Sequence, residues 1–245
     1  MGDEAEGQGR GQGRRRRRWP FVVTGLVVVV PLLVAVIGWF WWWPHYRPAL
    51  RDGERYGIDV SHHQGEIDWD QVAGDDIAFA YIKATEGGDH LDRRFTENWD
   101  GAAAAGLDRG AYHFFTLCRP GRDQAEHFLD TVPDDPDALP PALDLELSGN
   151  CADRPSQEWV EREIGVFVDM IEEPLGQPVV LYVGPDFEDR YDLRDQLDRP
   201  FWHRRILWRP DAPGWWMWQF SDRAAVDGID GPADLDVMRG DAPTR

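Results

Sequence analysis

The chain has 245 residues, with 45 acidic against 26 basic side chains and a net charge of -19. Because 42% of the residues are hydrophobic, the chain can bury a sizeable core, which excludes a disordered polyanion. Two cysteines are too few for a disulfide scaffold or a structural zinc site, and the acidic surface argues against nucleic acid as a partner.

The first predicted element in the chain is a membrane-spanning helix over residues 19–43. Residues 21–43 carry no charge, and a helix of this length spans about 34 Å, against roughly 30 Å of hydrocarbon in a bilayer. Residues 1–18 carry six arginines and three acids, a net charge of +3 that predicts a cytoplasmic tail. Trp39 and Trp41 lie at the other end, where an interfacial aromatic belt is expected.

Two alternatives compete with a retained anchor. A cleaved signal peptide fits less well, because the apolar stretch is long and no small-residue cleavage site follows it. A buried soluble helix fits less well still, because four tryptophans crowd its end beside Pro44. We therefore favour an anchor, with a linker at residues 44–55 and the rest of the chain outside the cytoplasm, in the periplasm or cell wall.

From Tyr56 onward, short apolar runs alternate with helical patterns. The first five predicted strands are YGIDV, AFAYIKA, RGAYHFF, PALDLEL and PVVLYV, and three more are predicted near residues 201–208, 216–220 and 234–237. Helices are predicted from FTENWDGAAAAG, DQAEHFLDTV and SQEWVEREIGVFVDMIEEPLG, with a short one near residues 185–191. Gly106 and Gly176 are suited to left-handed C-caps.

Alternating strands and helices predict parallel strands with helical crossovers, and eight strands are the number that closes a small barrel. The predicted fold is thus an α/β barrel over residues 56–241, preceded by one transmembrane helix and followed by a tail at 242–245. In a parallel barrel the active site lies at the carboxyl ends of the strands.

Two acids stand at the end of the fourth predicted strand. Side chains alternate along a strand, so in ALDLEL Asp144 and Glu146 share one face and the leucines share the other. Two carboxylates in a partly desolvated site disfavour each other's ionisation, which can keep one protonated near neutral pH. This is what a general acid beside an ionised partner requires; the alternative is a half-exposed edge strand with solvated acids.

Further acids end the first strand and open the last. Asp59 and Asp234 approach the first pair if strands one and eight are neighbours, and converging carboxylates favour glycoside hydrolysis. The doublet His62-His63 lacks metal-ligand spacing, and Ser61 has no nucleophile-elbow context. We expect no metal and no cofactor.

Seven segments carry a resemblance to a known family. In chain order they are YGIDVSHHQGEIDW, FAYIKATEG, GAYHFF, ALDLE, LYV, WMWQFS and GPADLDV. Together, over residues 56–239, they resemble glycoside hydrolase family 25, the Chalaropsis-type lysozymes or N-acetylmuramidases. The resemblance implies a TIM-like (β/α)5β3 barrel that cleaves the β-1,4 bond between N-acetylmuramic acid and N-acetylglucosamine, with peptidoglycan glycan strands as partners.

The resemblance also assigns roles to residues. It implies Glu146 as general acid/base and Asp144 as its charge partner, with Asp59 and Asp234 as flanking carboxylates. The family usually reads D-L-N at the last strand, where this chain has Asp-Leu-Asp. The extra acid, Asp236, either raises the local pKa values or points outward.

Other residues are predicted to contact substrate. Tyr112 and Trp218 are candidates for stacking on sugar faces, with core packing as the alternative. Lys83, the only lysine, is predicted to hold a carboxylate or a substrate group, with an ordinary ion pair as the alternative. The remaining candidates for substrate binding are Glu86, Tyr182, Arg204 and Asp236.

The two cysteines follow neighbouring strands of the predicted barrel. Cys118 follows the third strand and Cys151 the fourth, so they are expected to meet at the rim and form a disulfide outside the cytoplasm. Two free thiols are the alternative.

Three functions remain open from the sequence. A membrane-anchored muramidase leads, followed by a barrel that binds the cell wall without turnover. The third is a hydrolase of another acetamido glycan such as chitin, which lacks support because residues 139–143 supply no acid ahead of Asp144. Protein partners are left open.

Overall fold

The computed structural model describes residues 19–193, 197–211 and 214–240 of the chain, which divides after Trp42 into two compact units. The predicted basic tail, residues 1–18, and the C-terminal tail, residues 242–245, lie outside the described residues. Each unit is considered by itself.

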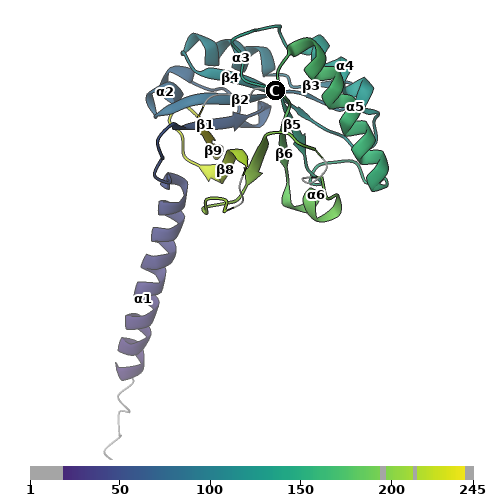
Figure 1. Ribbon diagram of the computed structural model, residues 1–245. Helices are drawn as coiled ribbons and strands as arrows, with labels where there is room; N and C mark the ends of the chain where they lie inside the picture. Colours follow the sequence, from purple (N-terminus) through teal and green to yellow (C-terminus); the bar gives the residue numbers. More distant parts are fainter. Residues whose placement is uncertain (1–18, 194–196, 212–213, 241–245) are drawn as a thin grey trace, which may run out of the picture. The chain divides into compact units, whose positions relative to one another are not determined.

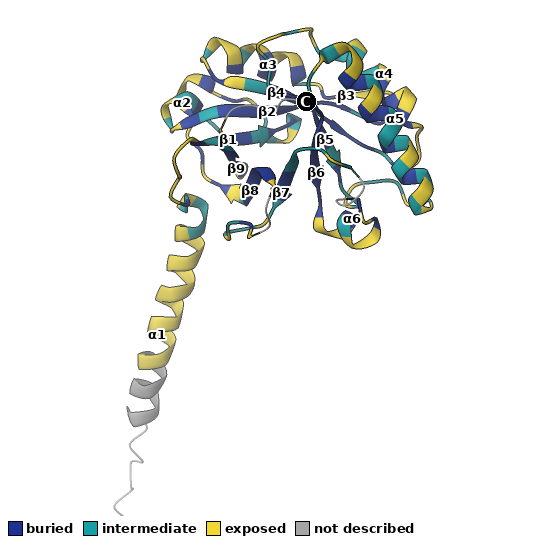
Figure 2. Cartoon of the chain, in the orientation of Figure 1, coloured by how far each residue is buried: buried dark blue, intermediate teal, exposed yellow. Residues whose placement is uncertain are grey.

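The first unit contains one long helix, α1 (Trp19–Trp42), with Pro31 inside it. From Val27 to Trp42 its side chains are exposed along the whole described length (Figure 2). The predicted helix is confirmed, and its length and apolar composition suit a membrane span.

The second unit is a closed barrel of eight strands (Figure 1). Six neighbouring pairs are parallel, including the β1–β2 pair that closes the barrel, and the last strand runs antiparallel to both of its neighbours. A two-residue strand, β3 (His90–Leu91), pairs only with the edge of β2. The barrel strands are β1 (Glu54–Val60), β2 (Ile77–Glu86), β4 (Asp108–Phe114), β5 (Ala142–Leu145), β6 (Val180–Val183), β7 (Phe201–Arg204), β8 (Trp215–Ala224) and β9 (Ala233–Arg239).

An α-helix follows each of the first five barrel strands. They are α2 (Trp69–Gly74), α3 (Phe95–Ala104), α4 (Gly121–Thr131), α5 (Gln157–Leu175) and α6 (Pro185–Arg190). The predicted (β/α)5β3 barrel is therefore confirmed. Both predicted left-handed glycines are also confirmed, with φ of 80° at Gly106 and 68° at Gly176.

One helix was not predicted from the sequence. α2 has only six residues, too few for a helical period to emerge from the pattern. Its start is fixed by Asp68, whose side chain accepts a hydrogen bond from the Gln71 backbone N–H at 3.2 Å.

The barrel wall separates two apolar layers. Leucine, isoleucine and valine side chains of the strands pack outward against the helices, whereas Phe79, Tyr81 and Trp202 belong to a smaller inner cluster. Gly57 and Gly110 leave space for the two inner rings, because a Cβ there would lie 2.2 Å from Phe79 and 2.5 Å from Tyr81. The inner rings fill part of the barrel.

The segment predicted as a linker is bound to the barrel. In the 3-10 helix η1 (Trp43–His45), the carbonyl of Pro44 accepts a hydrogen bond from the Ala225 N–H at 2.8 Å, and the Arg223 guanidinium lies 4.7 Å from the centre of the Trp43 ring. Arg47 donates to the Asp75 carboxylate at 2.6 Å. The first residues of the second unit are therefore held on the barrel wall rather than free in solution.

Candidate active site

A cavity of about 360 Å³ opens at the carboxyl ends of the strands. Predicted site residues that line it are Asp59, Lys83, Tyr112, Asp144, Glu146, Tyr182, Arg204 and Asp234. Others that line it include Ser61, His63, Gln64, Trp202, Gln219 and Asp222. Three predicted residues, Glu86, Trp218 and Asp236, lie outside the lining.

Of the two central acids, Asp144 lies in β5 and Glu146 is the first residue after it. Leu143 and Leu145 are fully buried against the helices, which leaves Asp144 and Glu146 facing the cavity. The Tyr182 hydroxyl lies 3.0 Å from Glu146 Oε1 and 3.1 Å from Gln219 Oε1, whereas Asp144 Oδ1 has no hydrogen-bond partner among the described residues.

Both central acids hold protons more tightly than in water. Burial, and then the charge of Glu146, raises the pKa of Asp144 well above its usual value. Burial also raises the pKa of Glu146, against the lowering effect of the Tyr182 hydrogen bond. Two such groups titrate as a pair, so the site retains a proton that can be transferred at higher pH than an ordinary carboxylic acid allows.

A second pair of acids comes from the junction of β1 and β9. Asp59 and Asp234 are opposite each other in the antiparallel register, which confirms that the first and last barrel strands are neighbours. Burial raises the pKa of Asp59 to about 6, although Gln219 Nε2 donates to its Oδ2 at 2.9 Å. Burial and the charge of Asp59 raise the pKa of Asp234 to about 9. Arg204, the nearby cation, donates to Asp222 at 2.8 Å.

Trp218 does not line the cavity, so the prediction that it binds sugar is wrong. Its side chain is fully buried on the outer face of β8, where Nε1 donates to the Arg205 carbonyl at 2.7 Å and the ring packs against Phe220. Alternation along the strand places its neighbour Gln219 inward instead. Trp202 of β7 is the tryptophan that faces the cavity.

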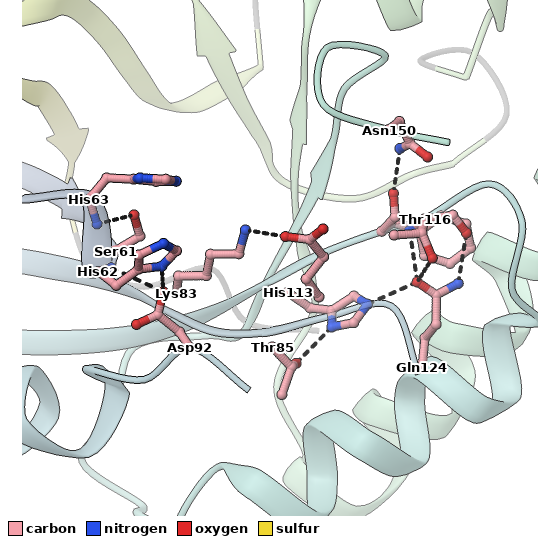
Figure 3. A network of polar contacts seen from close by, with 12 residues as sticks. Ser61, His62, His63, Lys83, Thr85, Asp92, His113, Thr116, Gln124 and Asn150 are labelled. Atoms are coloured by element: carbon pink, nitrogen blue, oxygen red, sulfur yellow. Dashed lines mark hydrogen bonds and ion pairs between the residues drawn. The ribbon is translucent and has the colours of Figure 1, made fainter. Parts of the chain in front are cut away.

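Asp236 and Glu86 also lie off the cavity, so neither is placed to bind substrate directly. Asp236 points inward, not outward, and is completely buried, with Oδ1 accepting from Trp202 Nε1 at 2.9 Å. Glu86 is the ion-pair partner of Lys83, whose Nζ donates to it at 2.7 Å and lies 4.8 Å from the centre of the Phe114 ring (Figure 3). Lys83 itself still lines the cavity.

The histidine doublet lies in a 3-10 helix, η2 (His62–Gln64), just after β1. Its two rings lie with centroids 4.1 Å apart. His62 Nδ1 is 2.7 Å from a buried Asp92 carboxylate oxygen, while His63 lines the cavity (Figure 3). Within the described part of the chain, His, Cys, Asp and Glu side chains form no group of three that could hold a metal ion.

A buried polar network supports the wall behind Lys83 (Figure 3). Thr85 Oγ1 lies 2.7 Å from His113 Nδ1, and His113 Nε2 lies 3.1 Å from Gln124 Oε1. Burial lowers the pKa of His113 to about 3, so the imidazole is neutral. Because an amide oxygen accepts, Nε2 carries the proton and Nδ1 accepts from the threonine hydroxyl.

The predicted disulfide is not formed. Cys118 and Cys151 are free thiols, and the Cys151 thiol donates to Asn150 Oδ1 at 3.4 Å. Asn150 joins the two loops instead, accepting from Leu117 N–H at 2.9 Å and donating to the Phe115 carbonyl at 2.7 Å. Burial, and then a hydrogen bond with the neighbouring Cys118, raises the pKa of Cys151 to about 11.

Sequence reasoning missed several cavity residues. They include Gln219, and also His63, Trp202 and Asp222, which come from segments where the pattern gave no facing direction. Gln219 had a usable signal, because it is the polar residue in WMWQF and should face away from the apolar layer.

A mostly parallel barrel whose mouth holds paired carboxylic acids with raised pKa values is typical of glycoside hydrolases. The comparisons with known proteins agree. The family model described as glycosyl hydrolases family 25 matches residues 58–229. The chain therefore belongs to glycosyl hydrolase family 25.

Individual relatives support this assignment. The chain is 34% identical to Lysozyme M1 of Streptomyces globisporus, over 80% of this chain and 71% of that protein. It is 37% identical to the uncharacterized protein YegX of Escherichia coli strain K12, over 80% and 76%. Among solved structures, a family 25 glycosyl hydrolase from Bacillus anthracis superposes with a TM-score of 0.73 at 34% identity, covering 80% of this chain and 94% of that one.

Proposed function

We propose that this family 25 hydrolase is a membrane-anchored lysozyme that cleaves the β-1,4 bond between N-acetylmuramic acid and N-acetylglucosamine in peptidoglycan. The observation that carries the proposal is the placement of Glu146 and Asp144 side by side in an acid-lined cavity, with Tyr182 bonded to Glu146. The identity to Lysozyme M1 supports the substrate.

Glu146 is the general acid of the proposed reaction. The raised pKa favours the protonated form, which can give its proton to the glycosidic oxygen as the bond breaks. Asp144 then stabilises the positive charge that develops at C1, or the substrate's N-acetyl group as it closes on that carbon.

Substrate binding falls to the cavity walls. Tyr112 and Trp202 offer ring surfaces from β4 and β7, which suit the faces of pyranose sugars. Lys83 and Arg204 supply the two cationic groups of the lining, which suit the lactyl carboxylate of muramic acid.

The anchor is the second part of the proposal. α1 is uncharged and long enough to span a bilayer, and the arginine-rich residues 1–18 favour a cytoplasmic N-terminus. The barrel would then lie outside the cytoplasm, where its glycan substrate is.

The decisive variant is Glu146→Gln, tested as detergent-solubilised full-length protein in a turbidity assay on purified peptidoglycan. Loss of the transferable proton should lower turnover by about 10²- to 10⁴-fold without unfolding the barrel. Glu97→Gln, on the exposed face of α3, is the matched control and should keep full activity. Near wild-type turnover in Glu146→Gln contradicts the assignment, and binding without turnover by the wild type favours a silent wall-binding barrel.

A further inference from the structure

Asp236 is a fully buried carboxyl group that the proposed reaction does not use. It belongs to β9, opposite Gly57 of β1 and Gln219 of β8. Its Oδ1 accepts a hydrogen bond from Trp202 Nε1 at 2.9 Å. Its Oδ2 has no hydrogen-bond donor among the residues that the structure describes, an arrangement that is costly for an ionised carboxylate.

The group beside it is another carboxyl, that of Asp59. The Asp59 and Asp236 carboxyl groups lie within hydrogen-bond reach of each other, and a bond between them requires a proton on one of them, because two carboxylates have no donor between them. Asp59 lines the cavity and accepts from Gln219 Nε2 at 2.9 Å. The more enclosed Asp236 is therefore the better place for the proton.

The groups that face Asp236 from the surrounding strands favour the same assignment. They are the Asp59 and Asp234 carboxyls, the Tyr81 phenol, the Trp202 indole and the Gln219 amide. None of these is a cation. The Arg204 guanidinium lowers the pKa of Asp59 and Asp234 but is bonded to Asp222. Burial and the charge of Asp59 raise the pKa of Asp236 well above its usual value.

A line of hydrogen bonds connects this pair to the proposed general acid. When Glu146 is protonated it can donate to the Tyr182 oxygen, Tyr182 can donate to Gln219 Oε1, and Gln219 Nε2 donates to Asp59. Asp59 can then accept a second bond from Asp236. With Glu146 and Asp236 protonated and Asp59 ionised, every donor in this line has an acceptor.

We propose that Asp236 is a positioning residue that keeps its proton at working pH and donates it to Asp59, so that Asp59 is held ionised and fixed in the wall of the cavity. The inference rests on the proposed function, because it assigns a role within that active site. An Asn side chain at this position can donate the same bond without titrating, whereas a Leu side chain cannot.

The test compares Asp236→Asn with Asp236→Leu through the pH dependence of kcat/KM on peptidoglycan. Asp236→Asn should keep kcat within about threefold of wild type and leave the acid limb of the profile in place. Asp236→Leu should lower kcat about tenfold and move the acid limb to higher pH by about one unit, because Asp59 loses a donor that favours its ionised form.

If Asp236 is ionised instead, the acid limb of the profile should shift in the opposite direction. Either substitution would then remove a negative charge beside Asp59 and move the acid limb to lower pH. That shift, or an identical profile in Asp236→Leu and wild type, overturns the proposal.

Infrared spectroscopy tests the proton without relying on activity or on the Leu variant. The difference spectrum between wild type and Asp236→Asn at neutral pH should contain the band of one protonated carboxylic acid. Absence of that band overturns the inference even if the enzyme is active. Presence of the band in a protein without muramidase activity supports the buried proton and places the failure in the proposed function.

Discussion

Single acids in the cavity have pKa values above those of ordinary acids. Burial is the first cause for Asp59, Asp144 and Asp234 alike, and mutual repulsion adds to it. Acids that stay neutral provide proton donors, but they also make the stability of the fold depend on pH.

Asp234 gives the clearest prediction of this kind. Its pKa is about 9 in the folded chain against 3.8 for an ordinary Asp, so between these values the folded state binds more protons than the unfolded state. The stabilising contribution is complete below pH 4 and is lost as pH rises toward 9, with a slope of at most about 1.4 kcal/mol per pH unit. Urea unfolding of wild type and Asp234→Asn across this range measures it.

The Asn variant cannot titrate, so its free energy of unfolding should decline less steeply than that of the wild type over the same pH range. Parallel pH dependences of the two proteins contradict the assignment of a retained proton to Asp234.

At the residue scale, sequence prediction worked where strand alternation was simple. In ALDLEL the leucines mark the outer face, so Asp144 and Glu146 had to point inward. In WWMWQF aromatic residues occupy both faces, and the register with β7 shifts by one residue after Phe201. Alternation alone therefore did not show that Trp202, and not Trp218, faces the cavity. The disulfide prediction was wrong for another reason, because the adjacency of two loops does not determine whether their thiols form a bond.

Among the elements, the helices α4 and α5 pack in close contact. A Cβ at Gly121, the first residue of α4, would lie 1.9 Å from the Glu163 carbonyl oxygen of α5, which is backbone that cannot turn away. The absence of a side chain at Gly121 is therefore what lets these two helices pack side by side on the barrel.

The substitution Gly121→Ala should destabilise the barrel by about 1–3 kcal/mol through overpacking. Gly165→Ala in α5 is the matched control, because a Cβ there meets nothing within 4 Å and an alanine favours the helix by about 0.5–1 kcal/mol. Thermal unfolding of both variants measures the contrast. Equal melting temperatures contradict the tight contact.

The order of barrel elements was predictable because the strands are short and apolar, helical patterns follow four of the first five, and Gly106 and Gly176 stand after two of those helices. α2 escaped prediction because six residues show no period, and the binding of residues 43–50 to the barrel escaped because its contacts join distant parts of the chain. Bonds such as Arg47 to Asp75 depend on the closed fold and leave no local signal.

For the whole molecule, the net charge of -19 combines a tail of +3 with a remainder of -22. The helix between them suits one crossing of a membrane, and the segment after it is fastened to the barrel near β8, where Arg223 contacts Trp43 and the adjacent Asp222 lines the cavity. Because α1 is uncharged and long enough to span a bilayer, we expect the enzyme to remain with carbonate-washed membranes.

The central claim is that this anchored barrel hydrolyses the glycosidic bond of N-acetylmuramic acid. The most direct test is to digest purified peptidoglycan with carbonate-washed membranes that carry the full-length chain and to identify the sugar at the newly formed reducing ends, with Glu146→Gln membranes as the blank. The account predicts N-acetylmuramic acid at those ends. N-acetylglucosamine there, or equal release by the Glu146→Gln membranes, contradicts it.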